Sequence, residues 1–466
     1  MPGQTPERLS ARRILALVAD PDTFAELPPP ARQSGPDGPL GWQGYDASRT
    51  RAAERTGEEE SVVVGTAHVE GTAAVLIAFE FGFLGGSLGE RTGDRLEAAY
   101  VHARAHRLPV VPLVATGGSR MQEGMLALSQ LQRVARQSAL TREAGLPQIA
   151  VLRDPTTGGG WATLGAGADV ILALPGAQVG FAGSRVRPPD ADPAAYTAEA
   201  QLAAGAVDTV VPLAGLRTVL GLWLRLLTAP ATDPADPPAA LGATGLPDTG
   251  LPDTGPPTTG LPATGWEAAR RARAPQRPRA QAYLDAYFTR RVALVGDRCG
   301  GADPDGMLCG FGERNGRTIA FAAQTGAATR PAGYRTAARL IRLADRLDIP
   351  VLTLVDTPGA ANDADAERQG AGAAIAELFG EVAAARMPIT TLVIGEGGSG
   401  GALALAAPGN TWATPDSYFS VIAPELAAAI LKRPPEEVEA TADQLRIRPQ
   451  DLVELGVVRG IVAPLP

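Results

Sequence analysis

Short, continuously apolar runs rich in β-branched residues recur along the chain, with helical stretches between them. Four of these runs are residues 110–115, 149–152, 351–355 and 389–394. Because both faces of each run are apolar, the pattern predicts buried strands of a mostly parallel sheet with covering helices. Residues 335–345 instead repeat their apolar positions about every 3.6 residues, which predicts an amphipathic helix.

The apolar runs fall into two blocks that look like copies of each other. A proline opens each run: Pro109 and Pro147 in the first block, Pro350 and Pro388 in the second. The two prolines of a block are the same number of residues apart in both blocks. A duplicated α/β unit is the simplest account of this spacing.

Composition changes mark the boundaries of the blocks. Residues 1–55 are rich in Pro, Gly, Arg and Glu, and we expect a loosely ordered arm. Residues 229–269 repeat Gly-Leu-Pro-x-Thr and have little to bury, which predicts a linker. The folded domains are then expected at 56–228 and 270–466.

Charge and cysteine content exclude several classes of protein. The net charge is −8, and the 42 basic residues are scattered arginines apart from Lys432, which argues against a nucleic-acid surface. Cys299 and Cys309 are too few for a disulfide scaffold or a four-cysteine zinc site, and they favour the reducing cytoplasm. We find no signal peptide in residues 1–20 and no apolar window of about 18 residues that would cross a membrane.

Glycine clusters follow a buried strand and precede a helix in both blocks. Residues 116–119 read Thr-Gly-Gly-Ser, and residues 396–401 read Glu-Gly-Gly-Ser-Gly-Gly. Unpaired amides at such a turn attract negative charge, so each cluster is a candidate oxyanion hole or phosphate cradle. The alternative is that the glycines only form tight turns. Their recurrence in two matched blocks favours the functional interpretation.

Other chemistry has weaker support. Residues 397–401 match the G-x-S-x-G nucleophile elbow, but a hydrolase needs a histidine after Ser399. The three histidines, His68, His102 and His106, all precede it. The last two are four apart on a predicted helix without a third ligand nearby, so we expect no metal site. Neither a P-loop nor a convincing dinucleotide fingerprint is present.

Two carboxylates flank the glycine clusters. Glu123 and Glu396 could act as acid and base on a bound thioester. Acidic residues near a helix N-terminus are also stabilised by the helix dipole, and we favour this structural role.

Long motifs in both blocks resemble one enzyme family. Residues 65–212 resemble the β subunit of bacterial acetyl-CoA carboxylase carboxyltransferase, and residues 281–464 resemble its α subunit. The motifs that carry the first resemblance are residues 78–87, 117–124, 154–159 and 180–183. The motifs that carry the second are residues 296–298, 333–335, 356–360, 394–403 and 419–425.

The resemblance implies a fold and a reaction. The family belongs to the crotonase superfamily, so we expect an α/β protein of two tandem crotonase-like β-β-α superhelix domains. Its members transfer a carboxyl group from carboxybiotin to the α-carbon of an acyl-CoA, and acetyl-CoA conversion to malonyl-CoA for fatty acid biosynthesis is the default expectation. The negative charges that develop on the thioester and on biotin would be held by backbone amides.

By resemblance, the two glycine clusters divide these charges. The acyl-CoA enolate is assigned to the amides of Gly117, Gly118, Gly158 and Gly159. Carboxybiotin is assigned to Gly397, Gly398, Gly400 and Gly401. Further substrate-binding residues are expected at Gly85, Gly86, Ser119, Arg120, Trp161, Phe181, Gly326 and Ala402.

The resemblance also implies partners. We find no Met-Lys-Met biotin attachment sequence and no ATP-binding carboxylase domain, so biotin is expected on a separate biotin carboxyl carrier protein, loaded by a separate biotin carboxylase. The family's active site forms between a β-type and an α-type half across a subunit interface, so we expect a homodimer or higher oligomer. No nucleic-acid or membrane partner is expected.

Several positions depart from the family pattern. The zinc ribbon common in the β subunit is absent, the usual basic residues are missing from residues 323–327 and 361–363, and Trp161 is expected to narrow the acyl pocket. Two alternatives stay open: a biotin-independent crotonase-type hydratase, isomerase or decarboxylase, and a catalytically weakened paralogue that acts as an assembly subunit.

Overall fold

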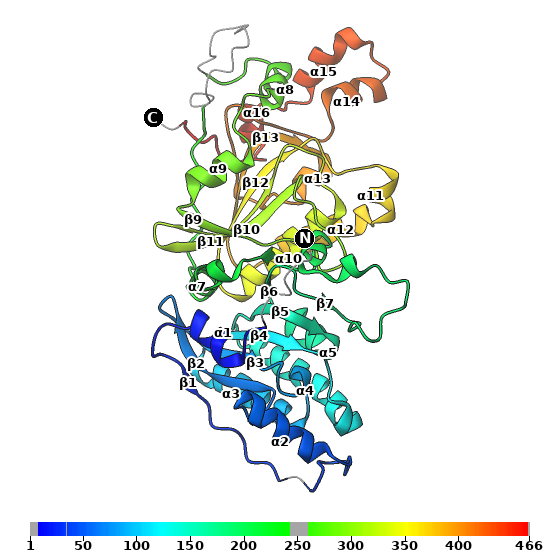
Figure 1. Ribbon diagram of the computed structural model, residues 1–466. Helices are drawn as coiled ribbons and strands as arrows, with labels where there is room; N and C mark the ends of the chain where they lie inside the picture. Colours follow the sequence, from blue (N-terminus) through cyan, green and yellow to red (C-terminus); the bar gives the residue numbers. More distant parts are fainter. Residues whose placement is uncertain (1–7, 34, 243–259, 465–466) are drawn as a thin grey trace. The chain divides into compact units, whose positions relative to one another are not determined.

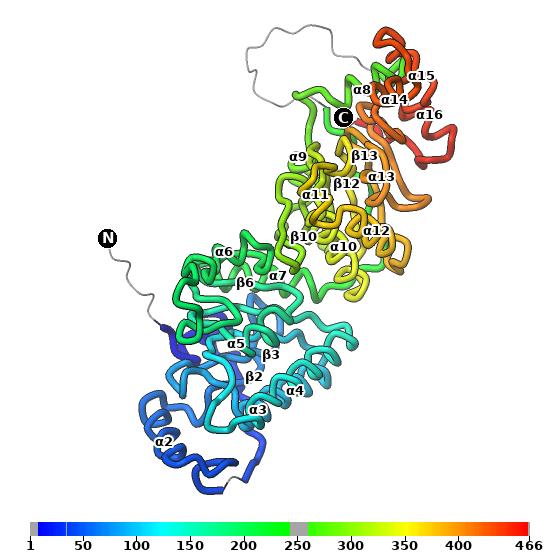
Figure 2. The backbone as a smooth tube through the Cα atoms, turned by 90° about the vertical axis from the view of Figure 1, so that its right-hand side faces the viewer, coloured from blue at the N-terminus to red at the C-terminus, as the bar shows by residue number. Residues whose placement is uncertain are grey.

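The computed structural model describes residues 8–33, 35–242 and 260–464. The chain divides into two compact units, which are described separately (Figures 1 and 2). The first unit comprises Met1–Ala229 with Arg298–Gly301, and the second comprises Pro230–Asp297 with Ala302–Pro466. The predicted repeats at 245–254 lie outside the described residues.

The first unit contains a sheet with the strand order β1-β2-β3-β4-β5-β6-β8, and β7 pairs with β5. β2 and β3 form an antiparallel hairpin, whereas β3 to β6 pair in parallel. The parallel strands are buried along most of their length, as their apolar runs predict. The strands are β1 (Ala25–Glu26), β2 (Val62–Val69), β3 (Thr72–Phe79), β4 (Val110–Thr116), β5 (Ile149–Thr157), β6 (Val170–Ala173), β7 (Val179–Gly180) and β8 (Thr209–Val210).

Long helices connect the parallel strands of this unit. α3 (Glu90–His106) leads from β3 to β4 and packs against β2 and β3, and α4 (Gly124–Glu143) leads from β4 to β5 and packs against α3 (Figure 1). The other helices are α1 (Ala11–Val18), α2 (Tyr45–Thr56), η1 (Leu84–Gly86), η2 (Met121–Glu123), α5 (Gly158–Gly160), η3 (Trp161–Gly165), η4 (Pro193–Tyr196), α6 (Ala198–Ala203), η5 (Leu213–Gly215) and α7 (Leu216–Leu227).

The second unit repeats this sheet, with the order β9-β10-β11-β12-β13-β14 and β15 paired to β13. β10 and β11 form the antiparallel hairpin, and β11 to β14 pair in parallel. The strands are β9 (Arg290–Ala293), β10 (Met307–Arg314), β11 (Arg317–Gln324), β12 (Val351–Thr357), β13 (Ile389–Gly398), β14 (Thr411–Ala413) and β15 (Tyr418–Ser420).

α10 (Pro331–Arg346) leads from β11 to β12 and packs against α12 (Ala371–Ala384). Its buried face includes Ala338, Ile341, Leu343 and Ala344, which confirms the predicted amphipathic helix. Figure 2 shows α14, α15 and α16 together at one end of this unit, beside α8. The remaining helices are α8 (Gly265–Arg273), α9 (Ala280–Tyr287), α11 (Ala364–Arg368), α13 (Ser399–Leu403), α14 (Pro424–Ile430), η6 (Pro435–Glu437), α15 (Val438–Gln444) and α16 (Pro449–Glu454).

The two sheets share a local irregularity at the same place. The register between β4 and β5 shifts between Val114 and Thr116. The register between β12 and β13 shifts between Val355 and Thr357. Beyond each shift a short parallel strand is added, β7 on β5 and β15 on β13. The duplication inferred from the sequence is therefore present in the strand register.

The N-terminal segment is packed, and the expectation of a loosely ordered arm is wrong for its described residues. Ile14, Leu15 and Val18 are buried on one face of α1. Arg32 then binds Asp94 of α3, with Nε 2.5 Å from Oδ2. A single apolar stretch and a few arginines are enough to fix this segment on the first unit.

The expected linker at 229–269 contains ordered residues at both ends. Ala235 and Ala240 are buried in the core of the second unit, and the Ala240 N–H donates to the Ala463 carbonyl at 2.9 Å. At the other end, α8 has already begun at Gly265. Small residues of this segment therefore complete the core next to it.

Among the described residues, no helix has the length and apolar content that a membrane span requires.

Candidate active site

In the first unit, two glycine turns lie against each other at the carboxyl ends of β4 and β5. Gly117 and Gly118 follow β4, and Gly158 begins α5 after β5. A Cβ atom on Gly158 would lie 3.2 Å from the Gly118 Cα, and the two residues have φ angles of +64° and +108°. A residue with a Cβ would be strained in this backbone conformation and, at Gly158, unusually close to the opposite turn.

Most of the amides predicted to hold an enolate already donate hydrogen bonds within the protein, which corrects their assignment. The N–H of Gly117 donates to Gly85 O at 2.9 Å, that of Gly118 to Thr116 Oγ1 at 3.0 Å, and that of Gly158 to Phe181 O at 3.0 Å. Gly159 differs because its N–H lies in the first turn of α5, where no preceding turn offers a carbonyl. Gly159 is therefore the predicted donor that best fits an oxyanion.

The predicted binding residues Gly85 and Gly86 support this turn from η1. Gly85 accepts the Gly117 N–H, and Gly86 lies so close to the Ala115 carbonyl that a side chain would collide with it. Ser119 forms a parallel bridge with Leu88. The loops after β3 and β4 thus meet, as the motifs suggested.

The two aromatic residues predicted to bind substrate have different surroundings. Trp161 packs its ring over Gly165 of its own helix η3 and joins the core around Leu152. Phe181 follows β7 with a side chain that is 73% exposed, while its carbonyl holds Gly158. The structure brings Phe181 to the turn, whereas one edge of the Trp161 ring packs against Gly165 and the rest of the residue is only partly buried.

The second unit contains the same pair of turns. Gly359 follows β12, and its N–H donates to Thr357 Oγ1 at 3.2 Å, as Gly118 donates to Thr116. A Cβ on Gly398 would collide with the Pro358 carbonyl. A bulky residue at 398 would therefore disturb the fold at this turn.

Main-chain hydrogen bonds around the two turns correspond one for one. In the first unit Leu88 N–H donates to Gly118 O at 2.9 Å and Arg120 N–H to Leu88 O at 2.8 Å; in the second, Thr329 N–H donates to Gly359 O at 3.2 Å and Ala361 N–H to Thr329 O at 2.9 Å. Sequence reasoning missed Thr116, Thr357 and Gly359. The shared Thr-x-Gly spacing at the ends of β4 and β12 was the signal that could have identified them.

The predicted biotin residues occupy two kinds of position. Gly397 and Gly398 lie inside β13, opposite Phe419 and Ser420 of β15. Gly400 and Gly401 lie in the first turn of α13, where N–H groups lack intrahelical acceptors. Gly400 faces open space, whereas a side chain at Gly401 would collide with Ala360. The open amides are therefore those of the helix turn.

The last two predicted residues lie beside this turn. Ala402 is fully buried in α13, so its side chain is part of the core. Gly326 follows β11, and its N–H donates to the Asp356 carbonyl at 2.7 Å. The loop after β11 is tied to α13 by Gln324, whose Nε2 donates to Gly401 O at 3.1 Å.

Ser399 connects β13 to α13 in a left-handed conformation with φ of +59°. Its counterpart in the first unit is Gly158, which has φ of +64°. The elbow geometry of the G-x-S-x-G motif is thus present. The three histidines belong to the first unit's strand β2 and helix α3, so Ser399 has no histidine within its own unit.

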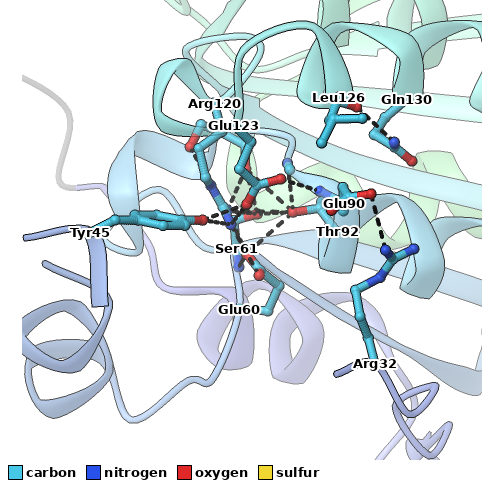
Figure 3. Close-up of polar contacts among 12 residues, drawn as sticks. Arg32, Tyr45, Glu60, Ser61, Glu90, Thr92, Arg120, Glu123, Leu126 and Gln130 are labelled. Atoms are coloured by element: carbon cyan, nitrogen blue, oxygen red, sulfur yellow. Dashed lines mark hydrogen bonds and ion pairs between the residues drawn. The ribbon is translucent and has the colours of Figure 1, made fainter. Parts of the chain in front are cut away.

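Arg120 is buried beneath the first turn, and its expected contact with substrate is wrong. Its side chain is 1% exposed, and Nη2 lies 2.5 Å from Glu60 Oε1 (Figure 3). The same nitrogen lies 2.7 Å from Ser87 O. Burial raises the pKa of Glu60, but the charge and hydrogen bonds of Arg120 outweigh this effect and hold it below the usual range. Arg120 is a positioning residue because its backbone continues the Gly117–Gly118 turn.

Glu123 and Glu396 are both occupied by structural partners. Glu123 accepts from the Tyr45 hydroxyl at 2.5 Å and from the Glu90 N–H, at the start of α3, at 2.6 Å (Figure 3). Glu396 Oε2 accepts from Arg273 Nε and from the Tyr418 hydroxyl, each at 2.8 Å. Glu123 thus caps the neighbouring helix α3, whereas Glu396 pairs with an arginine and a tyrosine instead of a helix N-terminus.

Each of the two units matches a family of known proteins. Residues 42–210 match the carboxyl transferase domain model, and residues 262–465 match the model described as acetyl co-enzyme A carboxylase carboxyltransferase-like. The chain is 40% identical to the acetyl-coenzyme A carboxylase carboxyl transferase subunits beta/alpha of Salinispora arenicola (strain CNS-205), over 98% of this chain and 82% of that protein. The chain belongs to the acetyl-CoA carboxylase carboxyltransferase family.

Other relatives of this carboxyltransferase have a wider range of names. It is 34% identical to the probable biotin-dependent acyl-coenzyme A carboxylase beta3 subunit of Mycobacterium tuberculosis (strain CDC 1551 / Oshkosh), over 91% of this chain and 83% of that protein. Among solved structures, transcarboxylase 12S aligns with a TM-score of 0.78 at 19% identity, covering 98% of this chain and 87% of that one. This likeness supports the crotonase-like fold of both units.

The strained turn at Ser399 gives a test of the carboxyltransferase structure. Ser399→Gly should raise the free energy of unfolding by about 1 kcal/mol, because a left-handed backbone is unfavourable for residues with a Cβ. Ser129→Gly, in the exposed part of α4, should lower it by about 0.5–1 kcal/mol. Chemical denaturation measures both, and equal losses of stability would contradict the assigned conformation.

The buried Arg120–Glu60 pair predicts a second, pH-dependent effect. Glu60→Gln should lower the free energy of unfolding by about 3–5 kcal/mol at pH 7, because Arg120 loses its buried ionised partner. Since the folded-state pKa of Glu60 is lowered, its stabilisation is present above the ordinary glutamate pKa of about 4.3 and is lost as the pH falls through the folded-state pKa. The difference in the free energy of unfolding between wild type and Glu60→Gln should therefore become smaller in acid.

Glu59→Gln is the matched control, because the neighbouring Glu59 side chain is 84% exposed. Its effect on thermal unfolding should stay within about 0.5 kcal/mol. If Glu60→Gln and Glu59→Gln have the same unfolding free energy, the buried Arg120–Glu60 pair does not stabilise the first unit.

Proposed function

We propose that this chain transfers a carboxyl group from carboxybiotin, carried on a separate protein, to the α-carbon of an acyl-CoA, with acetyl-CoA as the expected acceptor. The observation that carries the proposal is that the same strand-to-helix turn occurs once in each unit, after β5 in the first and after β13 in the second. Each places first-turn amides, at Gly159 and at Gly400, after a buried strand. The names of the relatives support acetyl-CoA as the acceptor.

The reaction needs two sites for negative charge, which explains why both copies of the turn are retained. One charge develops on the thioester oxygen when the α-proton leaves, and the other on the ureido group when the carboxyl group departs. A preorganised amide donor at such a site is worth on the order of 3 kcal/mol. We assign the thioester to the Gly159 turn and the ureido group to the Gly400 turn.

The arrangement disfavours a biotin-independent hydratase. That reaction would need Glu123 or Glu396 to exchange protons with a bound thioester. Glu123 is buried and held by Tyr45, and Glu396 is paired with Arg273. Main-chain donors are instead the groups that remain open at the turns.

The carrier and its loading enzyme are proposed as separate proteins. Lys432, the single lysine in the sequence, follows α14 in the segment Leu-Lys-Arg-Pro, which differs from a biotin attachment sequence. The two cysteines of the chain suit a reducing compartment, and we place the reaction in the cytoplasm.

We also propose that the enzyme works as a homo-oligomer. In the second unit Val421, Leu426 and Ile430 expose more than half of their side chains on and beside α14. Apolar groups gathered in this way mark interaction surfaces. The solved transcarboxylase 12S, which shares the fold, is described as a hexamer assembly with methylmalonyl-CoA bound.

The transfer is tested in reverse, with malonyl-CoA and free biotin. The purified protein should form acetyl-CoA at a rate that depends on biotin, measured by chromatography of the CoA esters. Acetyl-CoA formed equally well without biotin would instead indicate a decarboxylase. Absence of turnover with retained oligomers would indicate an assembly subunit.

Gly400→Val tests the site assignment without disturbing the core. Nothing lies within 4 Å of a Cβ at Gly400, so the fold should persist while the side chain fills the space over the turn. We expect biotin-dependent turnover to fall at least tenfold. Gly372→Val is the control, because Gly372 in α12 faces equally open space. Equal activity of the two variants would show that the Gly400 turn is not the biotin site.

Assembly is tested by Ile430→Asp, which places a charge on the exposed apolar face of α14. Sedimentation velocity should show a shift toward smaller species, because burying an unpaired carboxylate in an interface is costly. Val101→Asp, at an exposed position of α3, should leave the oligomer unchanged. If Ile430→Asp sediments as wild type does, α14 is not part of the interface.

A further inference from the structure

Two arginines meet one buried carboxylate at the carboxyl ends of β11, β12 and β13. Asp356 is fully buried; its Oδ1 lies 2.5 Å from Arg277 Nη2, and its Oδ2 lies 3.2 Å from Arg279 Nη1. The Glu396 N–H also donates to Oδ1, at 3.1 Å. One negative charge therefore faces two positive charges.

Arg277 is a structural member of this group. Its side chain is 5% exposed, and further N–H groups donate to the Ala272 and Ile394 carbonyls. These contacts attach the segment before α9 to β13. Because Arg277 is 5% exposed and bonds to acceptors inside the protein, we assign it a structural role.

Arg279, immediately before α9, is in a different situation. Its side chain is 37% exposed, and among the described residues Asp356 Oδ2 is its one hydrogen-bond acceptor. The guanidinium packs directly over Gly326, where a Cβ atom would collide with Nη1. Most of its five N–H donors are thus available beside the Gly326 turn.

Glu396, the other carboxylate near this group, does not neutralise Arg279. Glu396 is paired with Arg273, at 2.8 Å, and Arg273 also contacts Glu425. Residues 325–329, in the connection after β11, contain no charged side chain, and Arg330 at the end of this connection is paired with Asp363. The exposed positive charge at this turn therefore comes from Arg279.

The Gly326 turn is directly linked to the turn assigned to biotin. Gln324 donates to Gly401 O at 3.1 Å, and Thr357 Oγ1 donates to Ala327 O at 2.8 Å. Arg279, the Gly326 turn and the start of α13 thus belong to one continuous group at the ends of three parallel strands. A ligand anion bound at this edge would meet the Arg279 donors.

We propose that Arg279 binds the carboxylate of the carboxylated carrier group at the second-unit site, an inference that rests on the proposed function. A planar guanidinium pairs with a carboxylate through two parallel N–H donors, and Arg279 keeps such donors available after its contact with Asp356. The side chain orients the carboxylate for transfer, and the amides of the α13 turn hold the ureido oxygen. Arg279 is thus a substrate-binding residue.

The test compares Arg279→Gln and Arg279→Lys with wild type in the reverse reaction, using malonyl-CoA and free biotin. For Arg279→Gln, kcat/KM for biotin should fall about tenfold or more, while KM for malonyl-CoA should change less than twofold. Arg279→Lys should be intermediate, because an ammonium group keeps the charge without the two-pronged geometry.

Two further variants separate binding from folding. Arg291→Gln removes an arginine that pairs with Asp285 and should leave kcat/KM unchanged. Arg277→Gln should lower the melting temperature, whereas Arg279→Gln should not. If wild type shows biotin-dependent turnover and Arg279→Gln matches it, the inference is wrong and the proposed function stands. If wild type shows no biotin-dependent turnover, the proposed function fails and the inference fails with it.

Discussion

The close packing of two backbone turns is the constraint on which each unit depends. Where β4 and β5 end, a Cβ on Gly158 would lie only 3.2 Å from the Gly118 Cα, and in the second unit a Cβ on Gly398 would collide with the Pro358 carbonyl. A register shift just before each turn carries the strands into this contact. The contact fixes the direction of the next helix turn, so the geometry of the open amides at Gly159 and Gly400 follows from it.

The two copies keep this backbone but support it differently. In the first unit the residue after the turn is Arg120, buried in a network with Glu60 and Ser87. The corresponding residue in the second unit is Ala361, which makes the same main-chain bond and has no charge to bury. Duplication therefore conserved the hydrogen bonds that shape the turn, while the side chains below it diverged.

Sequence patterns were informative where one physical rule dominates. Apolar runs identified the buried strands, and the helix over residues 335–345 followed from its period, because burial alone decides both. Burial of polar groups was not predictable in this way. Arg120 stands in a motif that suggested ligand contact, but a carboxylate distant in sequence, Glu60, draws it into the core. Likewise, nothing local indicates that the Gly117 amide is taken by Gly85.

The difference in charge between the units bears on how one scaffold can serve two reactants. An amide donor stabilises charge in either copy, so the turns alone do not distinguish a thioester from a carboxylated ureido group. Side-chain charge does. The arginine beneath the first turn is neutralised and buried, which suits a neutral thioester oxygen that becomes charged only during reaction. Arg279 lies beside the second turn with donors in excess of its single contact, which suits a reactant that is already an anion when it binds.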